Sequence, residues 1–345
     1  MQINYYMEKM GVKLVDILKS EEISIEQCSN KIIAIDAYNA IYQFLSSIRQ
    51  YDGTPLMDSK GRITSHLSGL FYRTAKLMEN NIKPVFVFDG KHPDFKTSEQ
   101  ERRREVREEA MTEWKRALSK GDYENAKKYA KASSIITTEI IEQSKIIVEA
   151  MGIPIVQAPS EGEAQAAVMV QKGLCYAAAS QDYDSLLFGA PILIRNLSIT
   201  GKRKVFGRGY VQINPEKIEL QKNLENLGIT RDQLIVMGIL IGTDFDPGGI
   251  KGIGPKKALS IVKKYNNIDD VFKEVGWNFK TPYEKIFDFF KTPPYKDPEN
   301  MEFKEPDDEK IKKILCDEYE FSVDRIEKVL NELKKKRNSS LNKWF

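Results

Sequence analysis

The sequence predicts an α/β protein whose central, mostly parallel sheet is flanked by helices. Two short runs rich in isoleucine, valine and phenylalanine, KIIAID at 31–36 and PVFVFDG at 84–90, have the composition of strands buried on both faces. Helical stretches separate these runs, as the crossovers of a parallel sheet require. Each run also carries an aspartate at its end, and open parallel sheets bind ligands at the carboxyl ends of their strands.

The bulk composition is typical of a soluble globular protein. The chain has 345 residues, enough for about two domains or one α/β domain with insertions. Hydrophobic residues make up 41% and charged residues 30%, and no apolar run approaches the roughly 18 residues of a membrane span. The three cysteines form no CxxC pair, which disfavours a zinc ribbon or a disulfide framework. We therefore expect an intracellular protein with no membrane partner.

Periodicity and punctuation predict the remaining elements. Helices are expected over 37–49, 65–80, 137–151 and 231–242, where apolar residues recur at helical spacing. Further strands are expected at 153–157, 175–180 and 190–195, which are short and apolar. The stretch 265–307 contains several prolines and is expected to be loop-rich, whereas 308–336 is expected to hold two helical segments.

The segment 91–131 is dense in charge and poor in apolar residues. One interpretation is a solvated helix stabilised by ion pairs between residues four apart. The other is a mobile, basic helical insertion that grips phosphate groups beside a functional site. Lys96 and the arginines at 102–104 favour the second interpretation, because they follow Asp89 closely along the chain.

A glycine turn precedes the helix that is expected to begin at Pro255. Lys256 and Lys257 then occupy the first turn of this helix, where a cation opposes the helix dipole. With the backbone amides around Gly252 and Gly254, these lysines would form a phosphate cradle that needs no base recognition. A plain helical hairpin is the structural alternative.

Two pairs of carboxylates lie in the stretch 157–189. Glu161 and Glu163 stand at the expected start of an alanine-rich helix, and Asp182 and Asp184 follow the strand at 175–180. Both pairs have a structural interpretation, since Ser160 with Glu163 has the spacing of a capping box and Asp182 could cap the next helix. Four like charges in one small volume require a counter-ion, however, and oxygen ligands favour Mg²⁺ or Mn²⁺.

Acidic residues also end other apolar segments, and this repetition favours the metal interpretation. Strands that end in acids would bring them to one edge of the sheet. The predicted cluster consists of Asp36, Asp89, Glu161, Glu163, Asp182, Asp184 and Asp244. Two Mg²⁺ ions held about 4 Å apart by such a cluster suit phosphodiester hydrolysis.

Basic residues rather than histidines are expected to assist this chemistry. Lys96 and Arg103, in the charged insertion, could balance charge in the transition state, and Asp182 is counted with them as catalytic. The chain has only two histidines, His66 and His92, so we do not expect a histidine to act as the general base.

The motifs VFVFDGK, APSEGEAQAA, QDYDSLLFG, GTDF and GIKGIGPKKA occur in this order. From Met10 nearly to Phe345 the chain thereby resembles the flap endonucleases of the structure-specific 5′ nuclease superfamily, in their archaeal form. The resemblance implies a magnesium-dependent 5′ flap endonuclease with 5′–3′ exonuclease activity, acting in Okazaki fragment maturation and long-patch base excision repair. It implies two Mg²⁺ ions per active site, with Mn²⁺ able to substitute. Residues 1–9 precede the usual start of such proteins, so Met10 is the expected natural start.

The same resemblance implies roles for individual residues. Four of the acids match those nearest the first metal ion, and three match those around the second; the former are Asp36, Asp89, Glu161 and Glu163, and the latter Asp182, Asp184 and Asp244. Lys96 and Arg103 match the basic pair of a helical arch through which the flap threads. Tyr42 matches an aromatic residue that stacks near the scissile nucleotide.

The C-terminal half of the resemblance implies binding partners. The segment 252–257 matches a helix–two-turn–helix element that grips downstream duplex, often with a K⁺ ion held by backbone carbonyls. Leu341, Trp344 and Phe345 resemble the anchors of a box that binds a sliding clamp of the PCNA type. Asn338 stands where such boxes usually have glutamine, and Trp344 where they usually have phenylalanine. The expected partners are therefore 5′-flap and nicked duplex DNA and a sliding clamp, bound by a protein that is a monomer on its own.

The resemblance also suggests domain boundaries and a location. We expect an N-terminal nuclease region at 10–107 and an arch continuation or linker at 108–124. An intermediate nuclease region with the helix–two-turn–helix should span 125–267, a C-terminal extension 268–336, and the clamp-binding tail 337–345. An archaeal protein of this kind would lie in the cytoplasm, with the DNA of the nucleoid.

Three other functions are consistent with parts of the sequence. A related 5′–3′ exonuclease or excision-repair nuclease would share the acids but prefer a different junction. A non-catalytic protein that binds DNA junctions and the clamp would lack acids at several of the seven positions, and none is missing. A magnesium phosphatase or sugar transferase, suggested by the DxD at Asp182 and Asp184, leaves the glycine–lysine turn and the C-terminal tail unexplained.

Overall fold

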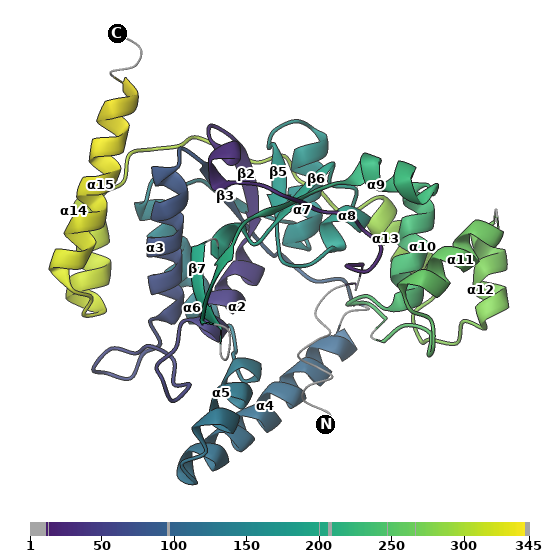
Figure 1. Ribbon diagram of the computed structural model, residues 1–345, viewed down its shortest axis with the longest axis horizontal. Helices are drawn as coiled ribbons and strands as arrows, with labels where there is room; N and C mark the ends of the chain where they lie inside the picture. The colour runs from purple at the N-terminus through teal and green to yellow at the C-terminus, as the bar shows by residue number, and fades with distance from the viewer. Residues whose placement is uncertain are drawn as a thin grey trace.

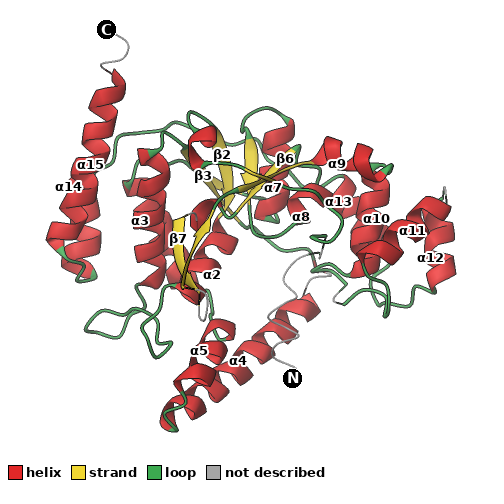
Figure 2. Ribbon diagram, viewed as in Figure 1, coloured by secondary structure: helices red, strands yellow, loops and turns green. Residues whose placement is uncertain are grey.

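A seven-stranded sheet forms the centre of the protein (Figures 1 and 2). The computed structural model describes residues 12, 14–94, 97–199, 201–205, 209–246, 248–265 and 267–341. The strand order is β1–β9–β6–β5–β2–β3–β4, in which β6, β5, β2, β3 and β4 are mutually parallel, and β9 and β1 add antiparallel strands at one edge. The strands are β1 (Glu21–Glu22), β2 (Ile32–Asp36), β3 (Lys83–Phe88), β4 (Ile155–Gln157), β5 (Ala177–Ala179), β6 (Ile192–Arg195) and β9 (Glu216–Glu219). The predicted α/β fold with a mostly parallel sheet is confirmed.

Alternation along the central strands divides the core into two layers. In β2, Ile33 and Ile35 pack into one cluster, whereas Ala34 packs into the other, on the opposite face of the sheet. The first layer is formed by α2 (Ala37–Ser47), α3 (Ser65–Glu79) and α6 (Thr138–Ala150). The second is formed by α7 (Gly162–Gln171), α8 (Asp184–Leu187), α9 (Leu220–Leu227) and α10 (Arg231–Ile241). Burial on both faces explains why the strand sequences are continuously apolar.

The charged insertion folds into two helices that extend away from the sheet (Figure 1). α4 (Thr97–Ser119) and α5 (Tyr123–Ala132) form a helical hairpin, and α5 also contacts α2. Gly121 makes the turn between them with φ +68°, and Asp122 caps α5 by accepting a hydrogen bond from the backbone amide of Asn125. The insertion is therefore helical, as both sequence interpretations required.

The segment 265–307 is less irregular than the sequence predicted. It contains α12 (Ile268–Val275) and α13 (Tyr283–Lys291), so the expectation of a loop-rich stretch is wrong for its first half. The two helices pack together through Phe272 and Tyr283, whose rings stack with centroids 3.9 Å apart. Beyond α13 the expectation is correct, because 293–307 contains no helix or strand.

The remaining C-terminal elements lie at opposite ends of the molecule (Figure 1). α11 (Pro255–Lys264) begins as predicted, with Gly254 at its N-cap and Pro255 in its first turn. The chain then returns across the body to α14 (Asp308–Lys312), a π-helical turn (Lys313–Glu318) and α15 (Val323–Leu341), which packs against α3. No helix among the described residues is long and apolar enough to cross a membrane.

Sequence reasoning missed the strands between β6 and α9. β7 (Gly201–Val205) and β8 (Gly209–Ile213) pair as a separate antiparallel ribbon, and β9 follows. β9 and its partner β1 consist mostly of charged residues, and Lys217 of β9 forms ion pairs with Glu21 and Glu219. Short edge strands of this kind lack the run of apolar residues from which a buried strand can be predicted.

Candidate metal centre

The predicted acids lie at one edge of the sheet because three adjacent parallel strands end there. Asp36 is the last residue of β2, and its register partner on β3 is Val87, two residues before Asp89. On the other side of β2, Ala179 of β5 pairs with Ile35, so Asp182 follows at the same edge. Adjacent strands that end in register thus bring together acids that are up to 146 positions apart.

The start of α7 contributes the next two acids. Asp89 Oδ1 accepts a hydrogen bond of 2.6 Å from the backbone amide of Gly162, which ties the end of β3 to this helix. A Cβ atom at Gly162 would lie 2.8 Å from the same oxygen, so any side chain at this position would displace the Asp89 carboxylate. Glu161 and Glu163, on either side of Gly162, are thereby held next to Asp89.

The alternative interpretation of the carboxylates as helix caps is wrong. Glu161, not Ser160, is the N-cap of α7, and its side chain makes no capping hydrogen bond. Tyr183, not Asp182, is the N-cap of α8. Asp182 instead accepts a hydrogen bond of 2.8 Å from the side-chain amide of Asn39.

The pKa values of two acids reveal which carboxylates lie close enough to repel one another. Burial raises the pKa of Asp36 well above its usual range, and the charges of Asp89, Asp182 and Glu161 raise it further. Burial likewise raises the pKa of Glu163, and Asp184 adds the largest of the neighbouring charges.

The second half of the cluster is connected through Asp184. Its Oδ1 accepts a hydrogen bond of 3.1 Å from the backbone amide of Val12. The charges of both Asp184 and Asp244, the latter just beyond α10, act on a residue that sequence reasoning missed, Asp246, which is 2% exposed. Burial raises the pKa of Asp246, with further contributions from Asp184 and Asp244. The structure therefore brings all seven predicted acids into one connected cluster and adds an eighth carboxyl beside them.

The donor set of this cluster fits divalent metal ions. Carboxylate oxygens predominate, which is the chemistry that Mg²⁺ and Mn²⁺ prefer, and so many buried like charges are costly without cations among them. Asp89, His92 and Glu161 each offer one ligand atom, and these three atoms lie within 4.8 Å of one another. His92 Nδ1 is 2.9 Å from Glu161 Oε1. Sequence reasoning considered histidine only as a general base and so missed His92 as a ligand, although its position three residues after Asp89 was the available signal.

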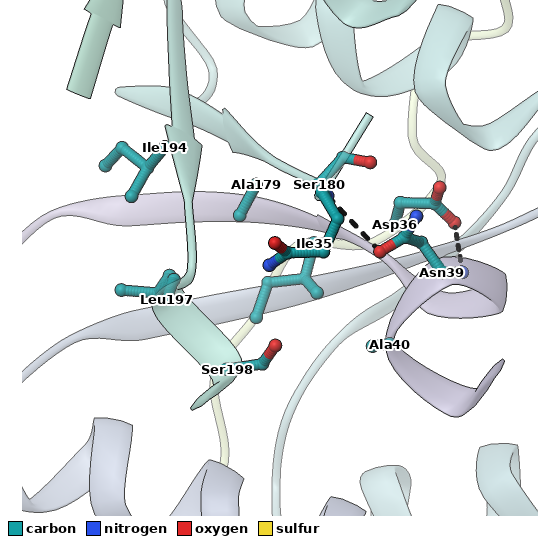
Figure 3. Close-up of a pocket in the computed structure, with 10 residues that line it drawn as sticks. Ile35, Asp36, Asn39, Ala40, Ala179, Ser180, Ile194, Leu197 and Ser198 are labelled. Atoms are coloured by element: carbon teal, nitrogen blue, oxygen red, sulfur yellow. Dashed lines mark hydrogen bonds between the residues drawn. The ribbon is translucent and has the colours of Figure 1, made fainter. Parts of the chain in front are cut away.

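Asn39 is a second residue that sequence reasoning missed. Its backbone amide donates to Asp36 Oδ1 at 3.1 Å, and its Oδ1 accepts from the backbone amide of Gln181 at 3.2 Å. In Figure 3, Asn39 lies beside Asp36 at the polar end of a pocket that Ser180 also lines. The apolar part of the pocket lining consists of Ile35, Ala40, Ala179, Ile194 and Leu197. Asn39 therefore connects the end of β2 with the loop that carries Asp182.

The predicted residues of the helical arch are only partly described. Tyr42 lies on α2, half-buried, with the guanidinium carbon of Arg107 5.6 Å from its ring centroid. This contact connects α2 with α4. Lys96 lies outside the described residues, and Arg103 belongs to α4 with a side chain that is not described.

The predicted duplex-binding residues lie at the turn before α11. Gly252 has φ +82°, which favours glycine, and Gly254 is the N-cap. Lys256 and Lys257 are exposed, and no acidic residue stands in the first turn of α11. The start of α11 therefore combines the backbone amides of its first turn with two exposed lysines, a combination suited to an anion.

Most of the predicted clamp-binding tail is not covered by the residues and side chains that the structure describes. α15 continues to Leu341, so the residues 337–341 are helical, and their side chains are not described. Trp344 and Phe345 lie outside the described residues.

Comparisons with known proteins place this geometry in a family. The family signatures described as XPG N-terminal domain and XPG I-region match residues 10–110 and 152–244. The chain is similar to flap endonuclease 1 of Pyrococcus abyssi, with 57% identity over 97% of this chain and 98% of that protein. Its fold matches the solved flap endonuclease-1 of Methanococcus jannaschii with a TM-score of 0.76 and 43% identity, over 96% of this chain and all of the other. The catalytic core of Rad2, solved with a DNA substrate, shares the fold at 22% identity, with a TM-score of 0.69 over 94% of this chain and 100% of that one.

Proposed function

Because this chain belongs to the flap endonuclease family, we propose that it hydrolyses a phosphodiester bond at the base of 5′ flaps in DNA. The observation that carries the proposal is the cluster of carboxylates at the carboxyl edge of the sheet, from Asp36 on β2 to Asp244 beyond α10. Such a cluster attracts cations, and cations allow a phosphate anion to approach acids that would otherwise repel it.

The proposed cofactor is a pair of Mg²⁺ ions, for which Mn²⁺ can substitute. Asp36, Asp89, Glu161 and Glu163 would hold the first ion, and the three aspartates at 182, 184 and 244 the second. When bound, the ions would activate the attacking water and stabilise the charge on the phosphate and the departing oxygen.

The protein's own contribution is to orient these acids. The side-chain amide of Asn39 fixes the direction of Asp182, as the backbone amide of Val12 does for Asp184. The amide of Gly162 does the same for Asp89. Each contact comes from a different element, so the cluster depends on the complete fold.

DNA is proposed to contact the protein at two places. The turn before α11, with Gly252, Gly254, Lys256 and Lys257, would hold the downstream duplex through its phosphates, with a K⁺ ion at the turn. The α4–α5 insertion, with Lys96 and Arg103, would contact the single-stranded flap and balance charge near the scissile phosphate. Tyr42 would stack near the scissile nucleotide. The same site would support 5′–3′ exonuclease activity at nicks.

We infer a role in Okazaki fragment maturation and long-patch base excision repair, where displaced 5′ strands arise. A sliding clamp would bind the tail through Leu341, Trp344 and Phe345, while the protein alone would be a monomer. The proposed regions are 10–107 and 125–267 for the nuclease, 108–124 for the arch continuation, 268–336 for the extension and 337–345 for the tail.

The decisive experiment is cleavage of an end-labelled 5′-flap duplex, with Mg²⁺ or with EDTA. We expect the wild type to release the flap near the junction only with Mg²⁺. Asp182→Ala should bind the DNA without cutting it, and Asp324→Ala, which changes an exposed aspartate of α15, should cut normally. Binding without cleavage by the wild type would instead support a non-catalytic junction-binding protein.

A further inference from the structure

We propose that His92 is a nitrogen ligand that, with Asp89 and Glu161, binds a divalent transition-metal ion and shifts the preference of this half of the site from Mg²⁺ towards Mn²⁺. The inference rests on the proposed metal-dependent function and specifies the metal that one half of the site selects. It assigns a role to the one described histidine in contact with the acidic cluster.

The positions of the three ligand atoms fit one coordination sphere. Neighbouring ligands of an octahedral ion with bonds of about 2.1 Å stand about 3.0 Å apart. His92 Nδ1 and Glu161 Oε1 are 2.9 Å apart, and the Asp89 oxygen completes a group spanning no more than 4.8 Å. An ion placed between them would come within bonding distance of all three atoms through rotation of these side chains.

The surroundings hold two of these ligands in place and leave the third accessible. Asp89 is anchored by the amide of Gly162, and Glu161 is held at the N-cap of α7 without using its carboxylate as a cap. The side chain of His92 is 30% exposed, whereas that of Glu161 is 11% exposed. The imidazole therefore stands at the solvent side of the group, where an ion can enter.

The chemistry of imidazole determines the expected preference. Mg²⁺ takes oxygen ligands almost exclusively, whereas first-row transition metals accept imidazole nitrogen readily. A site of oxygens alone discriminates little between Mg²⁺ and Mn²⁺, but one nitrogen ligand favours Mn²⁺. The competing explanation is that His92 only donates a hydrogen bond that orients Glu161.

Electron paramagnetic resonance of bound Mn²⁺ separates the two explanations. Nitrogen-14 coupling, measured by electron spin-echo modulation on untagged protein, reports an imidazole in direct contact with Mn²⁺. The chain has two histidines, and His66 is completely buried in α3 and bonded to Gln143, so the signal can be assigned to His92. We expect the coupling in the wild type and none in His92→Gln.

Affinities provide the second measurement. His92→Gln should weaken Mn²⁺ binding by at least about 10-fold and weaken Mg²⁺ binding, measured by competition, much less. Asp89→Asn is the comparison variant, because losing an oxygen ligand should weaken both ions. Glutamine at position 92 still hydrogen-bonds to Glu161, so a purely orienting histidine would leave both affinities near their wild-type values.

The outcomes distinguish this inference from the proposed function. Mn²⁺ that binds the wild type without nitrogen coupling, with equal effects of His92→Gln on both ions, would overturn the role of His92 and leave the carboxylate site intact. A wild type that binds neither ion would overturn the proposed metal-dependent function as well. Nitrogen coupling that disappears in His92→Gln supports the inference.

Discussion

The side-chain amide of Asn39 donates a hydrogen bond of 2.8 Å to Asp182, although the two residues are 143 positions apart. Asn39 also binds Asp36 through its backbone amide, and accepts a hydrogen bond from the backbone of Gln181 through Oδ1. One residue thus holds acids from the ends of two strands. Residues that orient metal ligands in this way affect affinity and rate nearly as strongly as the ligands do.

Replacing Asn39 with alanine should lower the rate of flap cleavage by about 10- to 100-fold. The reason is that Asp182 loses the donor that orients it, while the other acids stay in place. Gln43→Ala is the matched control, since Gln43 lies one turn further along α2 and accepts a hydrogen bond from Ser198 instead. Single-turnover rates with Mg²⁺ measure the effect, and similar rates for the two variants would contradict it.

Without metal, the wild-type protein should be less stable than a variant in which Glu163 of the acidic cluster is replaced by glutamine. Burial and the charge of Asp184 raise the pKa of Glu163, so its ionised form is disfavoured in the folded state. This penalty is absent in acid and grows as the pH rises through the raised pKa. In EDTA at neutral pH, Glu163→Gln should therefore melt above the wild type, by about 1–2 °C for each kcal/mol by which the substitution removes this penalty.

Metal should reverse this order. An ion at 100 times its Kd stabilises the folded state by about 2.7 kcal/mol, and the variant should gain less because it has lost a ligand. Calorimetry with EDTA and with excess Mg²⁺ gives both comparisons. If Glu163→Gln melts below the wild type in EDTA, the ionised Glu163 does not destabilise the metal-free protein.

The buried His66 should make stability depend on pH in a different range. Burial lowers the pKa of His66 from 6.5 to about 4. A lowered pKa gives stability that is present above pH 6.5 and is lost as the pH falls towards about 4, because the unfolded chain binds the proton more tightly. His66→Leu should remove this dependence, which is on the order of 3 kcal/mol over that range.

Denaturant unfolding in EDTA at several pH values tests this prediction. The quantity of interest is the difference in unfolding free energy between wild type and variant, which cancels the titration of the shared carboxylates. The difference should shrink as the pH falls from 6.5. If the unfolding free energies of wild type and variant change with pH in parallel, His66 binds its proton equally well in the folded and the unfolded state, and the prediction is wrong.

The exposed lysines at the start of α11 should contribute phosphate contacts rather than catalysis. The double variant Lys256→Gln/Lys257→Gln should weaken duplex binding and lower the slope of log K against log salt by about 1.8, which is 0.9 per lost phosphate contact. Lys335 and Lys336, exposed on α15, provide the matched double control. An unchanged slope in the first variant would place the duplex elsewhere.

The C-terminal residues 341–345 should affect cleavage only when a sliding clamp is present. Deleting 341–345 should leave basal cleavage intact and abolish stimulation by a sliding clamp of the PCNA type, because Leu341, Trp344 and Phe345 would be its anchors. Cleavage assays with and without the clamp measure both quantities. Equal stimulation of the truncated protein would exclude this tail as the binding site.

Most of the fold could be predicted from local patterns. The strands at β2 and β3 are continuously apolar because helices cover both faces of the sheet, and that composition is visible without a structure. The two helices α12 and α13 escaped prediction because prolines nearby suggested loops, although Asn267 and Gly276 are ordinary caps of α12. The strands β7, β8 and β9 escaped because their pairing partners, not their composition, make them strands.

The sequence by itself determined which acids end the strands and open α7, because a strand's composition and the residue that follows it are local properties. Only the tertiary structure decided that Asn39 reaches Asp182, that His92 touches Glu161 and that the charge of Asp184 acts on the buried Asp246. These contacts depend on β5 lying next to β2 and on the paths of loops, and neither is encoded in a local pattern. The hydrogen bonds that orient the acids therefore follow from the tertiary structure and cannot be predicted from local sequence.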